Sequence, residues 1–375
     1  MRNKVIGQLA AAAMSWSAGW AAAQASGVTV FGLIDLGAEV VTDVGTDRRS
    51  LWRMPSLTGS FPSRLGIRGS DDLGGGYSAS FVIEMGMAAD QGTLTQGGRA
   101  WGRQSLVALN TPLGAFSLGR QYTALYWSLL DADILGPNLY GTGSLDAGIP
   151  NARADNALGY RGKFGGLAVA ATWSLGRDAV NAGPSPAGTN CAGEGADARA
   201  CREWSLLLKY DTAGWGVALA DDRVFGRALG SPGDAVFGGL DSSAKSDDRL
   251  SLNGYVDFAR GRLAAGLVRR TNDGDPVKPR SSLWYLAASF RPAPLWVVDG
   301  EWLNLRYAAA ADFNAMLLAA RVTYSLSRHT AVYAQAGTIG NEPKSTLSLS
   351  AGAAGSNPAP GFGQRGLNLG MRHSF

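Results

Sequence analysis

The chain has 375 residues, with 34 Lys and Arg against 30 Asp and Glu, so its formal net charge is +4. Hydrophobic residues make up 46% of it and charged residues only 17%, a balance that argues against intrinsic disorder. It has 52 glycines but only two histidines, His329 and His373, which argues against a multi-histidine metal site or a histidine-based proton relay.

The first segment of the chain has the pattern of an export signal. Arg2 and Lys4 precede an uncharged, Ala-rich run, and Ala-Gln-Ala at 23–25 fits a small-x-small cleavage site. We therefore predict a cleaved signal peptide over residues 1–25 and a single mature domain over 26–375; the alternative is an uncleaved membrane anchor. Losing the two basic residues lowers the formal net charge from +4 to +2, too little to indicate nucleic acid as a partner.

Two-residue alternation of apolar and polar side chains recurs along the rest of the chain. Residues 77–87 and 367–375 are clear examples, and this period predicts strands with one apolar and one polar face. Counting between turn signals predicts sixteen strands, which start near residues 27, 61, 76, 99, 115, 153, 166, 202, 215, 248, 262, 281, 295, 314, 330 and 364.

The turns between these strands alternate between short and long. An even strand count with short turns on one side and long polar loops on the other is typical of an antiparallel transmembrane β-barrel of an outer membrane. A sheet in lipid must close on itself, because no water is present to satisfy an open edge. The alternative is a soluble, secreted β-sandwich or β-helix, which would need a second layer to cover the apolar face of every strand.

Cys191 and Cys201 are the two cysteines of the chain, ten positions apart in a polar, Gly- and Ala-rich stretch. Because an exported chain meets an oxidising compartment, we predict a disulfide that closes a surface loop. Two free thiols are the alternative.

Several segments together resemble the general diffusion porins of Gram-negative outer membranes, and the likeness spans the whole mature chain. They are VTVFGLID at 28–35, SRLGIRGSDDLGGG at 63–76, WGRQSLVAL at 101–109, LGRQY at 118–122, DNALGY at 155–160 and the terminal aromatic residue Phe375. The resemblance implies a trimeric, sixteen-stranded barrel whose third long loop, at about 122–152, folds inward to narrow the lumen. It also implies that Phe375 is an assembly signal.

The resemblance further implies basic side chains on the barrel wall that face acidic ones on the inward loop. The wall residues would be Arg64, Arg68, Arg120, Arg153 and Arg161, and the loop residues Asp131, Asp133 and Asp146. Alternation supports an inward direction for all the arginines except Arg120, which can face the lumen only if Gly119 forms a bulge or the chain bends inward there. Arg103 has the same difficulty.

These residues predict an outer-membrane porin, a passive channel for ions and small hydrophilic solutes. Because the basic residues slightly outnumber the acidic ones, we predict a weak preference for anions. The expected partners are two further copies of the chain in a homotrimer, outer-membrane lipids and the diffusing solutes, with no nucleic acid, cofactor or metal.

Three other functions are alternatives. A substrate-specific channel for sugars or organic anions could use the loop aromatics Tyr122, Tyr126, Trp127 and Tyr140. A structural or adhesive barrel would have a plugged lumen. An enzyme is not predicted, because neither histidine has a nucleophile at a fixed spacing.

Overall fold

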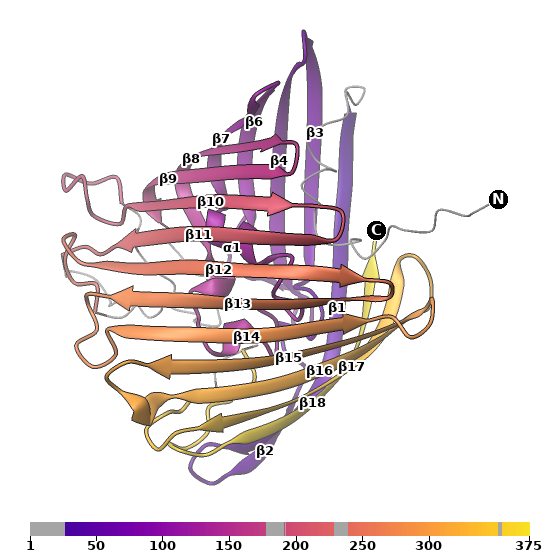
Figure 1. Cartoon of the computed structure of the whole chain (residues 1–375), viewed down its shortest axis with the longest axis vertical. Helices are drawn as coiled ribbons and strands as arrows, with labels where there is room; N and C mark the ends of the chain where they lie inside the picture. Colours follow the sequence, from indigo (N-terminus) through magenta and orange to yellow (C-terminus); the bar gives the residue numbers. More distant parts are fainter. Residues whose placement is uncertain (1–26, 178–190, 192, 229–238, 352–354) are drawn as a thin grey trace.

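The computed structural model describes residues 27–177, 191, 193–228, 239–351 and 355–375. This part of the chain forms an antiparallel β-barrel that encloses a short helix (Figure 1). Sixteen strands of the described residues form the wall: β1 (Gly27–Val44), β3 (Arg64–Gly74), β4 (Tyr77–Ala88), β6 (Gln104–Thr111), β7 (Gly114–Tyr122), β8 (Arg153–Phe164), β9 (Leu167–Arg177), β10 (Glu203–Asp211), β11 (Trp215–Phe225), β12 (Ser246–Phe258), β13 (Gly261–Asn272), β14 (Arg280–Phe290), β15 (Trp296–Tyr307), β16 (Ala315–Ser325), β17 (Thr330–Asn341) and β18 (Gln364–Ser374). The predicted signal peptide lies outside the described residues.

The barrel closes because β1 pairs with a strand on each side. Its first part is in register with β3, from Gly27 opposite Ser70 to Leu33 opposite Arg64. Its second part is in register with β18. At the junction, the amide of Phe375 donates to the carbonyl of Gly32 at 3.1 Å, and the amide of Gly32 donates back at 3.0 Å. The sheet therefore has no open edge at its seam.

The sixteen-stranded barrel predicted from alternation is confirmed, and the strand starts agree closely. The largest offset is at β6, expected near residue 99 and observed at Gln104. The structure adds two short strands that the alternation did not predict, β2 (Arg49–Arg53) and β5 (Thr93–Leu94). They pair with the ends of β1 and β4, so they lengthen two hairpins within segments that were expected to be loops.

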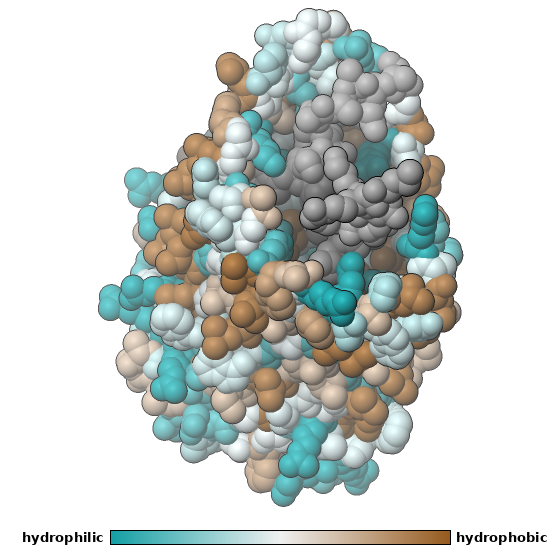
Figure 2. All heavy atoms as spheres, turned by 45° about the vertical axis from the view of Figure 1, so that its right-hand side comes forward, coloured by the Kyte–Doolittle hydropathy of each residue, from teal (hydrophilic) through white to brown (hydrophobic). Residues whose placement is uncertain are grey.

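Hydrophobic side chains cover the outside of the wall. On β10, Leu206 and Leu208 are exposed, whereas Leu207 between them and Lys209 after them are buried inside. Hydrophobic residues are spread across the outer surface seen in Figure 2. A large apolar surface of this kind suits hydrocarbon rather than water.

The inside of the wall is not uniformly polar, contrary to the simple expectation of a wet lumen. Val268, Leu283, Leu303, Leu317 and Ile339 point inward from β13 to β17 and are fully buried. The reason is that the long segment between β7 and β8 packs against them, as described below. On these strands both faces are apolar, one toward the outside and one toward the loop.

Short turns join the strands at one end of the barrel and longer loops at the other (Figure 1). The predicted disulfide between Cys191 and Cys201 is confirmed in the loop between β9 and β10, with their Cα atoms 5.3 Å apart. Three short 3₁₀ helices, η1 (Thr142–Ser144), η2 (Ile149–Asn151) and η3 (Ala311–Phe313), occur in the described loops. Among the described residues, no helix is both long and apolar enough to cross a membrane.

Candidate functional site

Residues 123–152, between β7 and β8, lie inside the barrel and are called the inner loop below. The loop begins with α1 (Ala124–Leu129), which contacts β9 to β12 and lies within the barrel in Figure 1. Leu125, Leu135, Leu139 and Ile149 pack on the apolar inner wall of β13 to β17. Burying these side chains fixes the loop to this part of the wall, because each contributes about 1.5–3 kcal/mol when removed from water.

Local backbone features fold the inner loop into this shape. Its two ends meet where the Thr123 amide donates to the Ala152 carbonyl at 3.1 Å. Gly136 has a φ of 72°, a left-handed conformation that suits glycine, and its amide donates to the Asp133 carboxylate at 2.8 Å. Gly148 lies against Arg249, and a Cβ there would come within 2.5 Å of the guanidinium carbon.

Asp146, one of the predicted loop acids, is bound to the wall behind the loop. Arg249 of β12 donates two hydrogen bonds to its carboxylate, Nε to Oδ2 at 2.8 Å and Nη2 to Oδ1 at 2.9 Å. The same guanidinium donates to Asp247 at 2.8 Å, and Arg270 also contacts Asp247. Burial opposes the charge of Asp146, but Arg249 outweighs it and lowers the pKa of this carboxyl to about 2.

Asp133 is also buried beside the wall, but fewer groups stabilise its negative charge. The Thr142 hydroxyl donates to its Oδ2 at 2.7 Å. Glu301 of β15 is hydrogen-bonded beside it and accepts from the Leu135 amide at 3.1 Å. Burial raises the pKa of Asp133 to about 6, because these hydrogen bonds only partly offset the desolvation of the charge.

Asp131 is the most exposed of the three predicted loop acids, with a side chain 33% accessible. It forms an ion pair with Lys209 of β10, and Arg262 of β13 lies 3.4 Å from its carboxylate. All three loop acids are therefore brought to the wall that supports the loop, and Asp131 alone among them is open to the lumen.

The predicted wall arginines lie on β3, β7 and β8. Arg153 places its guanidinium 4.7 Å from the ring of Tyr122, and its Nη1 donates to the Pro150 carbonyl at 3.0 Å. Arg64 lies near Glu84 and Tyr126, whereas Arg68 is exposed closer to the short-turn end. The guanidinium of Arg68 lies 5.4 Å from the ring of Phe31, and that of Arg161 lies 4.5 Å from the ring of Trp127.

Arg120 reaches the inside of the barrel through a bulge. The register between β7 and β8 shifts between Gly119 and Gln121, and Gly119 has a φ of 120°. Arg120 consequently pairs with Asp155 at 2.5 Å, although simple alternation would turn it outward. Arg103, which precedes β6, is likewise buried and pairs with Glu84.

An aromatic stack at the root of the inner loop joins these arginines to α1. The rings of Tyr122 and Tyr126 stack with centroids 3.8 Å apart, and Trp127 meets both edge-on. Arg103 and Arg153 both lie over Tyr122, at 5.9 and 4.7 Å. Tyr122 and Trp127 are buried, so they form the base of the loop rather than a surface along which a solute could slide.

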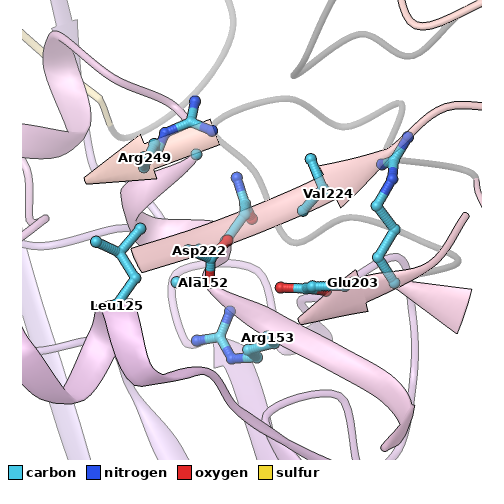
Figure 3. A pocket seen from close by; sticks show the side chains of 10 residues that line it. Leu125, Ala152, Arg153, Glu203, Asp222, Val224 and Arg249 are labelled. Atoms are coloured by element: carbon cyan, nitrogen blue, oxygen red, sulfur yellow. The ribbon is translucent and has the colours of Figure 1, made fainter. Parts of the chain in front are cut away.

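The space between the inner loop and the wall is nearly filled. Figure 3 shows a pocket where Arg153, Glu203, Asp222 and Arg249 converge near Leu125. Its volume is about 10 Å³, close to the room needed by one water molecule. At this point a solute cannot pass behind the loop, so any passage runs along the loop's other face.

Alternation did not single out several basic residues that the structure places at this site. Arg249, Lys209 and Arg262 hold the loop acids, although their partners lie far away in the sequence. Alternation along β10, β12 and β13 does place these three residues on the inner face of the wall, and this was the signal that could have identified them. The sequence contained no indication of which acid each would meet.

Comparison with known families settles what kind of barrel this is. Residues 9–344 match the family model described as Gram-negative porin. The chain belongs to the Gram-negative porin family. It is 30% identical to outer membrane porin protein 32 of Delftia acidovorans over 98% of this chain and 99% of that protein. It is 28% identical to an outer membrane porin protein of Bordetella pertussis over 70% of this chain and 69% of that protein.

Solved structures show the same fold. An anion-selective porin from Comamonas acidovorans matches with a TM-score of 0.72 at 22% identity, covering 93% of this porin and all of that chain. The trimer form of OmpT from Vibrio cholerae matches with a TM-score of 0.61 at 14% identity, covering 94% of this porin and all of that chain. The protein is thus an outer-membrane porin of the bacterial type, and its family consists of channels rather than enzymes.

Proposed function

We propose that this porin is a weakly anion-preferring diffusion channel whose narrowest passage lies between the inner loop and the wall of β3 to β8. The observation that carries the proposal is the charge balance around the inner loop. Cations outnumber carboxylates there: Glu84, Asp131, Asp155, Asp211 and Asp257 face Arg64, Arg99, Arg103, Arg120, Arg153, Arg161, Lys209 and Arg262.

Pairing leaves this excess in place. Asp155 is shared by Arg99 and Arg120, so one carboxylate there meets two cations. Asp131 is shared by Lys209 and Arg262, which also pair with Asp211 and Asp257, so charge is closer to balance on that side. Arginine keeps its charge at any physiological pH. An anion entering this passage gains attraction without a deep binding site, which favours fast and unsaturated diffusion.

The opposite charges of the inner loop and the wall arginines should create an electric field across the passage. We expect this field to be weaker than one created by a full row of loop acids. Asp133 and Asp146 are bound to the supporting wall, so we assign them to anchoring the inner loop. Asp131, which is open to the lumen, contributes most to the field, and buried Asp133 adds a smaller contribution when it is ionised. The preference for anions should therefore be modest, and it should fall as salt shortens the Debye length to about 3 Å at 1 M.

We also propose that the porin assembles as a homotrimer, that residues 1–25 are removed on export and that Phe375 is read as an assembly signal. The trimer proposal is supported by the trimer form among its structural neighbours. The assembly role of Phe375 is supported by its place at the seam, where it completes the pairing of β1.

The test is the reversal potential of single variants in planar bilayers across a salt gradient. Arg64→Glu and Arg153→Glu should each shift selectivity toward cations, because each reverses a charge beside the passage. The permeability ratio should change by roughly two- to fivefold, since a charge in water at 4 Å is worth about 1 kcal/mol before screening.

Arg306→Glu is the matched control, because Arg306 is an exposed residue of β15 on the outer face of the wall. It should leave the reversal potential unchanged. Equal reversal potentials for the wild type and both inner variants would contradict the assignment of Arg64 and Arg153 to the passage.

A further inference from the structure

Three arginines lie together on the outer face of β13, β14 and β15, and they are called the outer triad below. Arg269 is opposite Ser282, and Ser282 is opposite Arg306, so one cross-strand row holds two of them. Arg280 lies two residues beyond Ser282 on the same face of β14 and is opposite Thr271. With strands about 4.8 Å apart, the Cα atoms of Arg269 and Arg306 are about 10 Å apart.

The outer triad is at the end of the barrel that bears the long loops. All three side chains are exposed, whereas their neighbours along the strands, Val268 and Leu305, point inward and are buried. The triad therefore projects away from the lumen and takes no part in the charge balance of the passage.

Within the described part of the chain, no acidic residue forms an ion pair with any of the three. The hydrogen bond recorded for Arg306 runs from Nε to the Asn304 side-chain oxygen at 3.3 Å. Arg223, on the same outer face, differs because it pairs with Asp248 at 2.7 Å. Three neighbouring cations without a carboxylate repel one another, and an anionic partner would relieve that repulsion.

The surface directly beneath the triad is apolar except for Asn304 of β15. One step toward the short-turn end, Leu267 is opposite Trp284, and in the next row Leu286 is opposite Trp302. Trp284 and Leu286 are both at least half exposed. The same three strands thus present a cationic level and, below it, an apolar level with an indole at the boundary, as expected where headgroups meet acyl chains.

We propose that the outer triad binds the headgroup of a phosphorylated glycolipid of the outer leaflet, whose acyl chains lie on the apolar level. The long loops of an outer-membrane barrel are extracellular, so the triad faces the outer leaflet. Arginine pairs with phosphate through two parallel hydrogen bonds. The spread of the triad suits a headgroup with two phosphates, such as the bisphosphorylated disaccharide of lipid A, better than the single phosphate of a phospholipid.

The test is a titration of the folded, detergent-solubilised porin with bisphosphorylated lipid A, with bound lipid counted by native mass spectrometry. The triple variant Arg269→Gln, Arg280→Gln and Arg306→Gln should bind about a hundredfold more weakly, at about 1 kcal/mol for each cation near a lipid surface. Arg223→Gln is the control and should bind as the wild type does, because Arg223 is already occupied by Asp248.

Two further measurements use the wild type alone, so they test the proposal even if the triple variant folds poorly. Monophosphorylated lipid A and phosphatidylglycerol should both bind more weakly than the bisphosphorylated lipid, and inorganic phosphate should not displace it. Phosphatidylglycerol binding as tightly as lipid A, or a triple variant with unchanged affinity, would overturn the proposal. Single-channel conductance should be the same in the triple variant, so this result is independent of the proposed selectivity.

Discussion

Buried carboxylates in the inner loop are attachment points, and the partner of each determines how it behaves. Asp146 has a bidentate guanidinium in front of it, whereas Asp133 has a hydroxyl, an amide and a second carboxyl group. The first carboxylate keeps its charge because its partner is a cation. The second lies where burial favours the neutral form.

Removing Arg249 should loosen the inner loop. Arg249→Ala leaves Asp146 and Asp247 buried without their main cation, and breaking such a pair costs about 3–5 kcal/mol. The variant barrel should unfold at a lower temperature in a heat-modifiability gel, and its open channel should show larger current noise.

Arg223→Ala is the control for this experiment, because it removes an ion pair to β12 on the outer face instead. It should cost no more than about 1 kcal/mol, as expected of a partly exposed pair. An Arg249→Ala variant with the stability and current noise of the control would show that the ion pair does not hold the loop.

The charge of Asp133 should make selectivity depend on pH. Its pKa is raised to about 6, so the folded protein takes up a proton there as pH falls from about 7 to about 5. Loss of this negative charge should increase the anion preference at the lower pH. Glu301 and Arg321 are the charged groups that face Asp133 from the wall.

The measurement is the reversal potential at both pH values for the wild type and Asp133→Asn. The variant should resemble the wild type at low pH and should respond less to pH. If Asp133→Asn responded to pH as strongly as the wild type, another group would have to be responsible.

Among the strands, β7 depends on one glycine for the direction in which its last side chains point. The bulge at Gly119 turns Arg120 inward, and a Cβ at this position would come within 2.2 Å of the Ser105 carbonyl oxygen. Gly119→Ala should therefore destabilise the barrel by roughly 1–3 kcal/mol or move the bulge. A heat-modifiability gel measures the first effect.

Gly165 offers a matched control in the turn between β8 and β9. It also has a positive φ, of 63°, but nothing lies within 4 Å of its missing Cβ. Gly165→Asn should be tolerated, since asparagine adopts this conformation at little cost. Equal loss of stability in both variants would contradict the steric account of Gly119.

The sixteen wall strands could be predicted because a barrel in lipid imposes the same two-residue period on each of them. β2 escaped detection because RSLWR lies in a polar segment whose pairing to β1 extends beyond the wall. The partners of the loop acids could not be predicted, because Asp146 and Arg249 are 103 positions apart. Arg120 shows the intermediate case: its direction depended on a bulge that the sequence allowed but did not require.

At the scale of the whole molecule, the barrel has apolar surface outside and, over part of its circumference, inside as well. The outer surface is matched by lipid and the inner one by the inner loop, so neither requires a second protein layer. Strands β14 to β16 illustrate this, since segments such as SLWYLAASF carry apolar residues on both faces. Weakened alternation in these strands was therefore a sign of the loop behind them, and it did not indicate a different fold.

We propose that the lumen is an open passage, narrowed by a loop fixed to one wall and lined with an excess of cations. The most direct test is single-channel recording of the purified porin in planar bilayers at increasing KCl concentrations, with a salt gradient in the final step. We predict ohmic openings whose conductance rises in proportion to KCl without saturating, and a reversal potential on the anion side. A folded barrel that conducts no current, or one whose conductance saturates, would contradict this account.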